Sequence, residues 1–249
     1  MEWFGRSYKN FDFEIFSLSH FIIIGLLIIG GILLYYYREH LRKNQFRIGE
    51  IIIASSLIVF EGTYHFWMIR NHSWNISHAL PLELCSISLI LTVVLLFTKK
   101  KIVYEILIFT ALLGASQAIF TPIVNYDFPH FRFFHFFYTH LMTIWVALYF
   151  TWVKEYRPTI WSVFKLFIFL NLLLPIILLI NNRVGGNYLF LNKKPPSPSL
   201  MDFLGPYPWY ILSLEGLLIG LSIIVWLIFR EKTSRKASLK EENPLNSRT

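Results

Sequence analysis

Seven long apolar runs alternate with short polar connections along the chain. They cover Leu18–Tyr37, Ile48–Ile69, Leu82–Thr98, Ile102–Val124, Phe134–Val153, Thr159–Ile180 and Trp209–Phe229. Runs of this length are typical of helices that cross a bilayer, where backbone polar groups must find partners within the segment itself. The pattern predicts an all-α polytopic membrane protein, a bundle of seven transmembrane helices.

Composition agrees with this prediction and excludes a soluble domain. Apolar residues make up 55% of the chain and charged residues only 15%. The formal net charge is +8, and the single cysteine, Cys85, excludes an intrachain disulfide. Metal ions and cofactors are not expected from the composition or from any motif.

The basic residues are unevenly divided between the two ends of the predicted bundle. Fifteen Lys and Arg residues belong to one set of helix ends and to the tail, against seven at the opposite ends. The positive-inside rule then places the N-terminus outside and the C-terminus in the cytoplasm of a cell-membrane protein. Basic residues at a membrane surface attract anionic lipid heads, so the excess of charge predicts membrane lipids as partners and no nucleic acid.

This topology divides the chain into three parts. Residues 1–17 lack the basic and apolar regions of a signal peptide and are expected to form an extracytoplasmic segment. Residues 18–229 form the transmembrane domain. Residues 230–249 are polar and mixed in charge, which predicts a disordered cytoplasmic tail.

The fifth apolar run begins with an unusually polar stretch, FRFFHFFYTHLMTIW at 131–145. At about 100° per residue, its polar residues fall within an arc of about 140°, which suits a buried site. They are Arg132, His135, Thr139, His140 and Thr143. Ionisable residues in a membrane usually face a bundle interior or a wet cavity. The opposite face, with Phe134, Phe137, Leu141 and Trp145, suits lipid tails.

Other polar residues in the apolar runs lie at the same predicted depth, toward the outer leaflet. The candidate site consists of Glu61, His65, Glu83, Cys85, Gln117, Arg132, His135, His140 and Glu215. Glu61 and His65 are four residues apart and share one helix face. Because helices two and five each carry a polar face, we expect them to face each other, with His65 and His140 lining one cavity.

The role of Cys85 has two interpretations. It follows Pro81 within the first turns of a predicted helix, where the helix dipole favours an anion and a nearby histidine could remove the thiol proton. The alternative is an inert, partly buried thiol.

The remaining features have simpler interpretations. His20 is expected to be an interfacial residue, and Glu50 and Glu105, near the basic ends, need no special role. The longest connection, 181–208, is either a lid or an exposed linker.

Four strings carry a family resemblance: LPLELCSIS, FRFFHFFYTHLM, NYLFL followed by KP, and SLMDFLGPYPWY. Together they resemble the YwaF-type family of bacterial integral membrane proteins. That family is similar to the animal transmembrane protein 164 family, regarded as lipid acyltransferases that use a Cys and a His. The resemblance implies a thiol role for Cys85 and a base role for His140.

Three functions remain open. The first is a phospholipid acyltransferase or transacylase, with Cys85 as nucleophile, His140 or His135 as base and Arg132 as a phosphate contact. The second is a non-enzymatic transporter or receptor-like protein that binds a small polar ligand in the same outer pocket. The third is a metal-dependent intramembrane hydrolase, which would use His65, His135 and His140 with Glu61 or Glu215.

Overall fold

The computed structural model describes residues 2–7, 11–43, 46–195 and 200–231, and the described chain is all-helical apart from one isolated bridge between Asp12 and Tyr126. Six helices have the length and apolar composition needed to cross a membrane: α1 (Leu18–Tyr36), α3 (Arg47–Arg70), α5 to α6 (Lys101–Phe120), α7 (Phe131–Trp152), α8 (Ile160–Val184) and α9 (Trp209–Phe229). A shorter apolar helix, α4 (Leu84–Thr98), lies between α3 and α5. The predicted all-helical membrane fold is confirmed.

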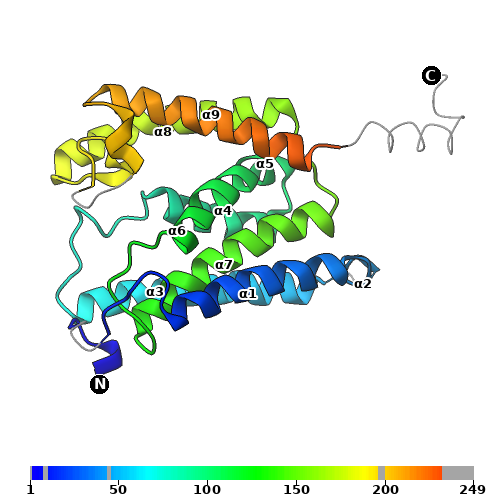
Figure 1. The fold of residues 1–249 in the computed structure, drawn as a ribbon, viewed down its shortest axis with the longest axis horizontal. Helices are drawn as coiled ribbons and strands as arrows, with labels where there is room; N and C mark the ends of the chain where they lie inside the picture. Colours follow the sequence, from blue (N-terminus) through cyan, green and yellow to red (C-terminus); the bar gives the residue numbers. More distant parts are fainter. Residues whose placement is uncertain (1, 8–10, 44–45, 196–199, 232–249) are drawn as a thin grey trace, which may run out of the picture.

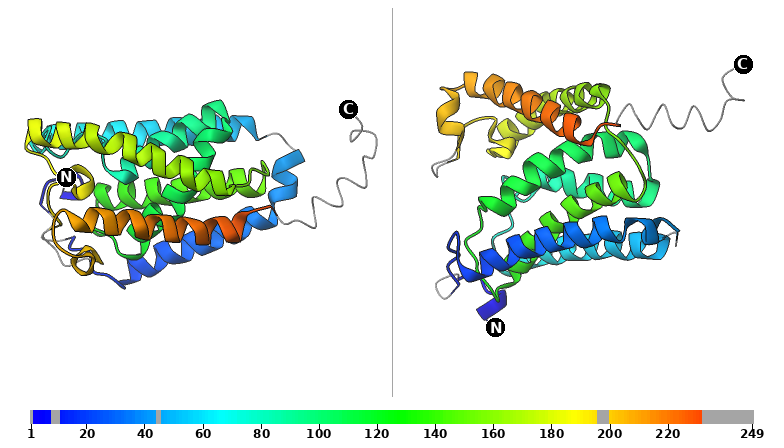
Figure 2. Two further views of the ribbon diagram at one scale, coloured as in Figure 1. Left: turned by 90° about the horizontal axis from the view of Figure 1, so that it is seen from above. Right: turned by 45° about the vertical axis from the view of Figure 1, so that its right-hand side comes forward.

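The helices form three tiers (Figure 1). α8 and α9 pack together on one side, and α1 and α3 lie on the other, with the short helix α2 (Arg38–Lys43) following α1. The middle tier holds α4, α5, α6 and α7. Figure 2 shows the same separation from two other directions. Most of the predicted tail, from residue 232 onward, lies outside the described residues.

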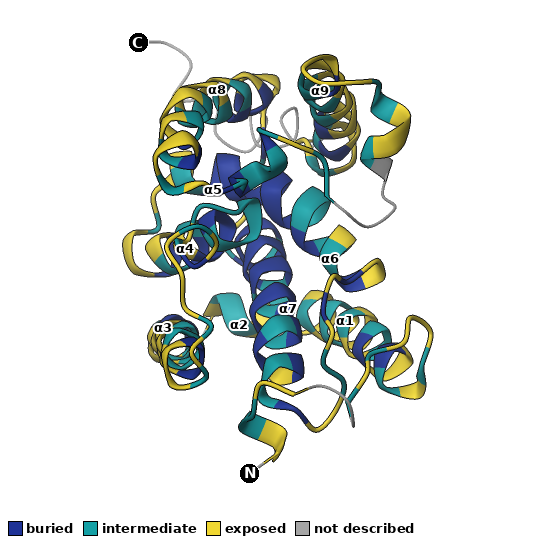
Figure 3. Ribbon diagram, turned by 90° about the vertical axis from the view of Figure 1, so that its left-hand side faces the viewer, coloured by how far each residue is buried: buried dark blue, intermediate teal, exposed yellow. Residues whose placement is uncertain are grey.

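α7 is the central helix, and this corrects one prediction. Viewed end-on, it is largely buried, while α1, α8 and α9 expose their outer faces (Figure 3). Phe137 and Leu141, predicted to face lipid tails, are buried in a cluster with Ile23 of α1 and Ile119 of α6. The helical period marked them correctly as apolar but could not show that α1 covers them.

The helix from Lys101 to Phe120 is interrupted by a π-helical segment, η2 (Thr110–Ala115), between α5 (Lys101–Phe109) and α6 (Ser116–Phe120). Segments of this kind are frequent at functional sites because they shift the register of side chains along a helix. η2 packs against both α7 and α4. A Cβ on Gly114 would lie 3.3 Å from the Leu84 side chain, so η2 closely approaches the start of α4.

Helix boundaries differ from the predicted ones by a few residues for local reasons. α4 begins at Leu84 rather than Leu82, because residues 80–83 form an extended and bent entry. α8 continues to Val184 and ends at Gly185, whose positive φ of 65° suits glycine. The fourth predicted run ends at Phe120 instead of Val124.

His20 is a buried structural residue of the bundle, and its predicted interfacial depth stays a prediction. Its side chain is fully buried, its Nδ1 accepts from the Phe16 amide at 3.0 Å, and its Nε2 lies 2.8 Å from the Ile119 carbonyl oxygen. Both ring nitrogens have partners, so His20 ties α1 to the end of α6.

Candidate functional site

The candidate site begins at the N-terminal end of α7. His130 caps this helix, since its Nδ1 accepts from the Arg132 amide at 3.1 Å. Its Nε2 donates to the Gly5 carbonyl oxygen at 3.0 Å, and its ring stacks on Tyr126 with centroids 4.2 Å apart. Burial lowers the pKa of His130 and so favours the neutral ring. Only a neutral ring can accept a hydrogen bond at Nδ1 while it donates one at Nε2. The N-terminal segment is thereby held against the start of α7.

A hydrogen-bond chain runs from Arg132 through His135 to Glu61. Arg132 Nη1 lies 2.9 Å from His135 Nδ1, and His135 Nε2 lies 3.0 Å from Glu61 Oε2. Arginine can only donate, so His135 Nδ1 accepts and its proton sits on Nε2, which donates to the carboxylate. The geometry therefore indicates that His135 is neutral and lies between the positively charged Arg132 and the negatively charged Glu61.

His65 approaches the same carboxylate from the other side. Its Nδ1 accepts from the Trp74 indole N–H at 3.2 Å, which leaves its proton on Nε2. That nitrogen lies 3.6 Å from Glu61 Oε1, beyond hydrogen-bond distance but within ion-pair range if the ring is protonated. Each carboxylate oxygen of Glu61 thus has a histidine beside it. The second and fifth predicted helices are α3 and α7, and their contact confirms the prediction that they face each other.

The guanidinium of Arg132 is held flat by aromatic rings. Its Cζ lies 3.9 Å from the Tyr64 ring centroid and 5.7 Å from that of Trp67, an arrangement in which the ring quadrupole attracts the cation. Within the described residues, Nη1 is the guanidinium nitrogen that has a hydrogen-bond partner. The remaining donors of a half-buried guanidinium suit an anion such as a phosphate.

His140 lies deeper on α7 and has a different environment. Its side chain is buried, and its Nδ1 donates to the Phe136 carbonyl oxygen at 2.6 Å. Its Nε2 is buried without a hydrogen-bond partner in the described structure. The hydrogen bond at Nδ1 places the ring proton there, so Nε2 carries a lone pair. This nitrogen can therefore accept a proton.

Cys85 is the second residue of α4 and is half-buried. Its neighbour Leu84 touches η2, and η2 packs on α7, so the thiol and His140 belong to adjoining parts of the middle tier. The two side chains are not hydrogen bonded to each other. Their catalytic pairing stays a prediction.

The long connection after α8 covers the start of α4. The Leu189 amide donates to Glu83 Oε2 at 3.2 Å, and the buried Tyr188 hydroxyl donates to the Ile76 carbonyl oxygen at 2.6 Å. The Tyr210 hydroxyl of α9 donates to the Phe190 carbonyl oxygen. Glu83 therefore anchors residues 188–190 over the first turn of α4, and this part of the connection is packed rather than a free linker.

The other candidate residues do not join these groups. Gln117 is exposed on α6, and Glu215 is half-buried on α9, in the tier opposite α3. Within the described part of the chain, His65 and His140 share no hydrogen-bond partner, so the common cavity stays a prediction. In the described chain, no three His, Cys, Asp or Glu side chains are grouped to hold a metal ion.

The sequence analysis missed a charged cluster at the basic end of the bundle. Glu50 of α3 is 1% exposed and accepts from the Tyr149 hydroxyl at 2.7 Å. Its carboxylate also pairs with Lys154 at 2.7 Å, Arg47 at 3.1 Å and Lys99 at 3.2 Å. Glu105 is likewise paired, with Lys165 of α8 at 2.5 Å. The sequence did contain a signal for this cluster: Glu50 lies one turn inside a helix whose end is close to several other basic helix ends.

Comparison with known proteins identifies the family. A model of the TMEM164 family matches residues 15–226, which include all seven apolar helices apart from the last residues of α9. No curated protein and no solved structure matches the chain.

Proposed function

We propose that this chain, a multi-pass membrane protein that belongs to the TMEM164 family, transfers acyl groups between membrane lipids through a thioester on Cys85. The observation that carries the proposal is the buried Nε2 of His140, an imidazole nitrogen with a free lone pair and no hydrogen-bond partner among the described residues. A satisfied core histidine such as His20 uses both ring nitrogens. An unsatisfied one costs free energy, and active sites are where such a cost is retained.

The chemistry balances with the groups of this chain. His140 Nε2 takes the proton of the Cys85 thiol, and the sulfur attacks the ester carbonyl of a donor lipid. The tetrahedral intermediate collapses, the C–O bond breaks, and the leaving alkoxide receives the proton from His140. The hydroxyl of an acceptor lipid then attacks the thioester, with His140 again taking its proton and returning it to the sulfur.

The position of Cys85 supports the role of nucleophile. The first turn of α4 presents backbone N–H groups and the positive end of the helix dipole, which suit the oxyanion that forms when the sulfur attacks a carbonyl. Residues 188–190 cover this turn, and excluding water protects a thioester from hydrolysis. Hydrogen bonds between catalytic groups are often long in the absence of substrate. The Cys85 thiol and the His140 imidazole therefore have to reach hydrogen-bond distance only when the lipid is bound.

Arg132 supports a phospholipid as the donor. Its stacked guanidinium keeps donors for an anion, and Glu61 and His135 hold it in place through the hydrogen-bond chain. In this proposal Arg132 contacts the lipid phosphate, and His65, His135 and Glu61 position it.

A second candidate function rests on the same arginine. Without thiol chemistry, the Arg132 site would be a receptor-like site for a small anion or a phosphate head, as in a non-enzymatic binding protein. This reading needs Arg132 and Glu61 but neither Cys85 nor His140.

The experiment compares lipid profiles of cells that express the wild type or a variant, together with labelling by an alkylating lipid-like probe. Cys85→Ser and His140→Ala should each abolish the change in acyl composition that the wild type causes. Labelling of Cys85 should fall strongly in His140→Ala. Ser86→Ala, at the next position of the same helix, is the matched control and should behave like the wild type.

Two outcomes would decide against the proposal. If Cys85→Ser keeps the full lipid change, thiol catalysis is wrong and hydrolysis by the histidines and Glu61 becomes the leading reading. If no variant or wild type alters the lipids, while purified protein binds a phosphate-bearing ligand in an Arg132-dependent way, the receptor-like function is favoured.

A further inference from the structure

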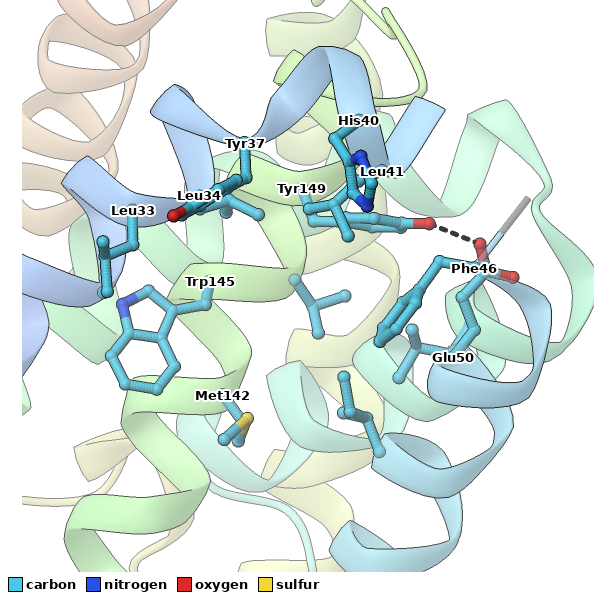
Figure 4. A pocket seen from close by; sticks show the side chains of 14 residues that line it. Leu33, Leu34, Tyr37, His40, Leu41, Phe46, Glu50, Met142, Trp145 and Tyr149 are labelled. Carbon is cyan, nitrogen blue, oxygen red and sulfur yellow. Dashed lines mark hydrogen bonds between the residues drawn. The ribbon is translucent and has the colours of Figure 1, made fainter. Parts of the chain in front are cut away.

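A cavity of about 410 Å³ lies at the basic end of the bundle, away from the candidate site (Figure 4). It is bounded by α1, α2, α3, α4 and α7, and its size falls within the roughly 300–1,000 Å³ of small-ligand sites. Glu50, at one end of it, is eleven residues from Glu61 on α3, a separation of about 16 Å along the helix. The cavity is therefore a separate site.

The walls of the cavity are mainly apolar, and several residues at its edges are exposed. Leu34 of α1, Ile53 of α3 and Met142 and Val146 of α7 line the interior. Leu33, Tyr37 and Phe46, at the edges, are 49%, 51% and 42% exposed. Since α1 and α3 span the membrane, an opening between them faces lipid, and apolar chains can enter without crossing water.

A carboxylate and a hydroxyl lie together at one end of the cavity. Figure 4 shows the Tyr149 hydroxyl bonded to the Glu50 carboxylate there, beside Phe46. Arg47, Lys99 and Lys154, which are not among the lining residues of the cavity, each contact that carboxylate. Three cations against one carboxylate leave an excess of two positive charges next to the cavity, and their side chains are 22% to 39% exposed.

We propose that this cavity holds one acyl chain of an anionic phospholipid, whose phosphate lies beside Lys99 and Lys154. An apolar interior with a cationic end matches a ligand that has an apolar chain and an anionic head. Basic residues at a helix end also lie at the depth of the lipid head groups, where each attracts anionic lipid. The lipid joins α1 to α3 across α7, and this role does not depend on the acyl-transfer proposal.

The test uses photocrosslinking in lipid nanodiscs. Purified full-length protein is reconstituted with phosphatidylglycerol that carries a diazirine in one acyl chain, irradiated and analysed by mass spectrometry of peptides. Adducts are expected on the α7 segment from Met142 to Val146 and on the α1 segment from Leu33 to Tyr37. Matching phosphatidylcholine, which has no net charge, should label these segments several-fold less.

Two variants and one matched control separate this site from the general lipid belt. Val146→Trp fills the cavity and should reduce the adducts several-fold, whereas Leu172→Trp, on the exposed face of α8, should leave them unchanged. Lys99→Gln combined with Lys154→Gln should remove the preference for phosphatidylglycerol over phosphatidylcholine.

A competition experiment on the wild type keeps the test decisive if a variant fails to fold. Excess unlabelled phosphatidylglycerol should reduce the adducts, because a specific site can hold only one of the two lipids at a time. The proposal is overturned if the cavity segments are labelled no more than exposed α8, or equally by both lipids. It is also overturned if unlabelled phosphatidylglycerol does not compete, which would indicate an ordinary lipid belt or closure by a second copy of this chain.

Discussion

Glu61 is the residue on which the polar groups of α3 and α7 converge. Its two oxygens face His65 and His135, and the second histidine relays the contact to Arg132. Arg132 and Glu61 carry opposite charges, so the group as a whole is neutral with both histidines uncharged. Neutrality is what makes such a cluster tolerable inside a membrane.

This arrangement predicts the effect of changing Glu61. In Glu61→Ala, His135 Nε2–H and Arg132 lose their acceptor and counter-charge, and the free energy of unfolding should fall by about 1–3 kcal/mol. Glu61→Gln should lose less, because the amide oxygen still accepts from His135. Thermal unfolding in detergent measures both, with Glu14→Ala at an exposed position as the control. A Glu61→Ala variant as stable as the wild type would contradict the role given to this carboxylate.

At the scale of single residues, the sequence revealed which groups were unusual but not which would meet. The spacing of Glu61 and His65 placed them on one helix face, and the helical period placed Arg132 and His135 within one polar arc without marking them as partners. The aromatic partners Tyr64, Trp67 and Trp74 were not recognisable, because aromatic residues are common throughout this chain. Glu215 and Gln117 share the predicted depth of the other candidate residues but do not join them, since depth in the membrane does not determine lateral position.

At the scale of elements, the packing of α1 on α7 depends on one glycine. A Cβ at Gly30 would overlap the indole of Trp145, whose N–H donates to the Leu27 carbonyl oxygen of α1 at 3.2 Å. Small residues let membrane helices approach closely, and here the close approach brings α1 over the apolar face of α7.

Substitution of two glycines in α1 tests this packing. Gly30→Val should push α1 away from Trp145 and lower stability by about 1–3 kcal/mol, as expected for overpacking. Gly25→Val is the matched control, because no described atom outside the local helix lies within 4 Å of a Cβ built there. Unfolding in detergent should separate the two variants. Equal melting temperatures would show that Trp145 moves aside at no cost.

The elements also show where periodicity succeeds and fails. α1, α3, α7, α8 and α9 lie within a few residues of the predicted runs, because length and apolarity determine them locally. The π-helical η2 left no mark in the pattern, since a π-helix shifts hydrogen bonds by one residue without requiring particular side chains. The structure shows that η2 contacts α4 and α7, which the pattern could not indicate.

At the scale of the whole molecule, the two ends of the bundle differ in chemistry. One end holds the Arg132–His135–Glu61 chain and the N-terminal segment, and the other holds Glu50 with its three cations. The division of basic residues between these ends is the basis for the predicted orientation.

Reporter fusions test that orientation directly. Fusions after Lys100 and after Thr249 are both expected to report a cytoplasmic location, because both positions belong to the basic set of ends. A fusion within residues 71–80 should report the opposite side. An extracytoplasmic signal at Lys100 or at Thr249 would contradict the predicted topology of seven crossings.

The sequence by itself determined that this protein crosses the membrane as helices, which of its polar residues are costly to bury, and where its basic residues concentrate. Each of these follows from the local order of side chains along the chain. Only the tertiary structure decided that α7 lies at the centre, that Glu61 joins His65 to His135, and that Glu50 gathers three cations. Those outcomes depend on the lateral packing of helices that are far apart in sequence, and hydropathy carries no information about which apolar faces pair.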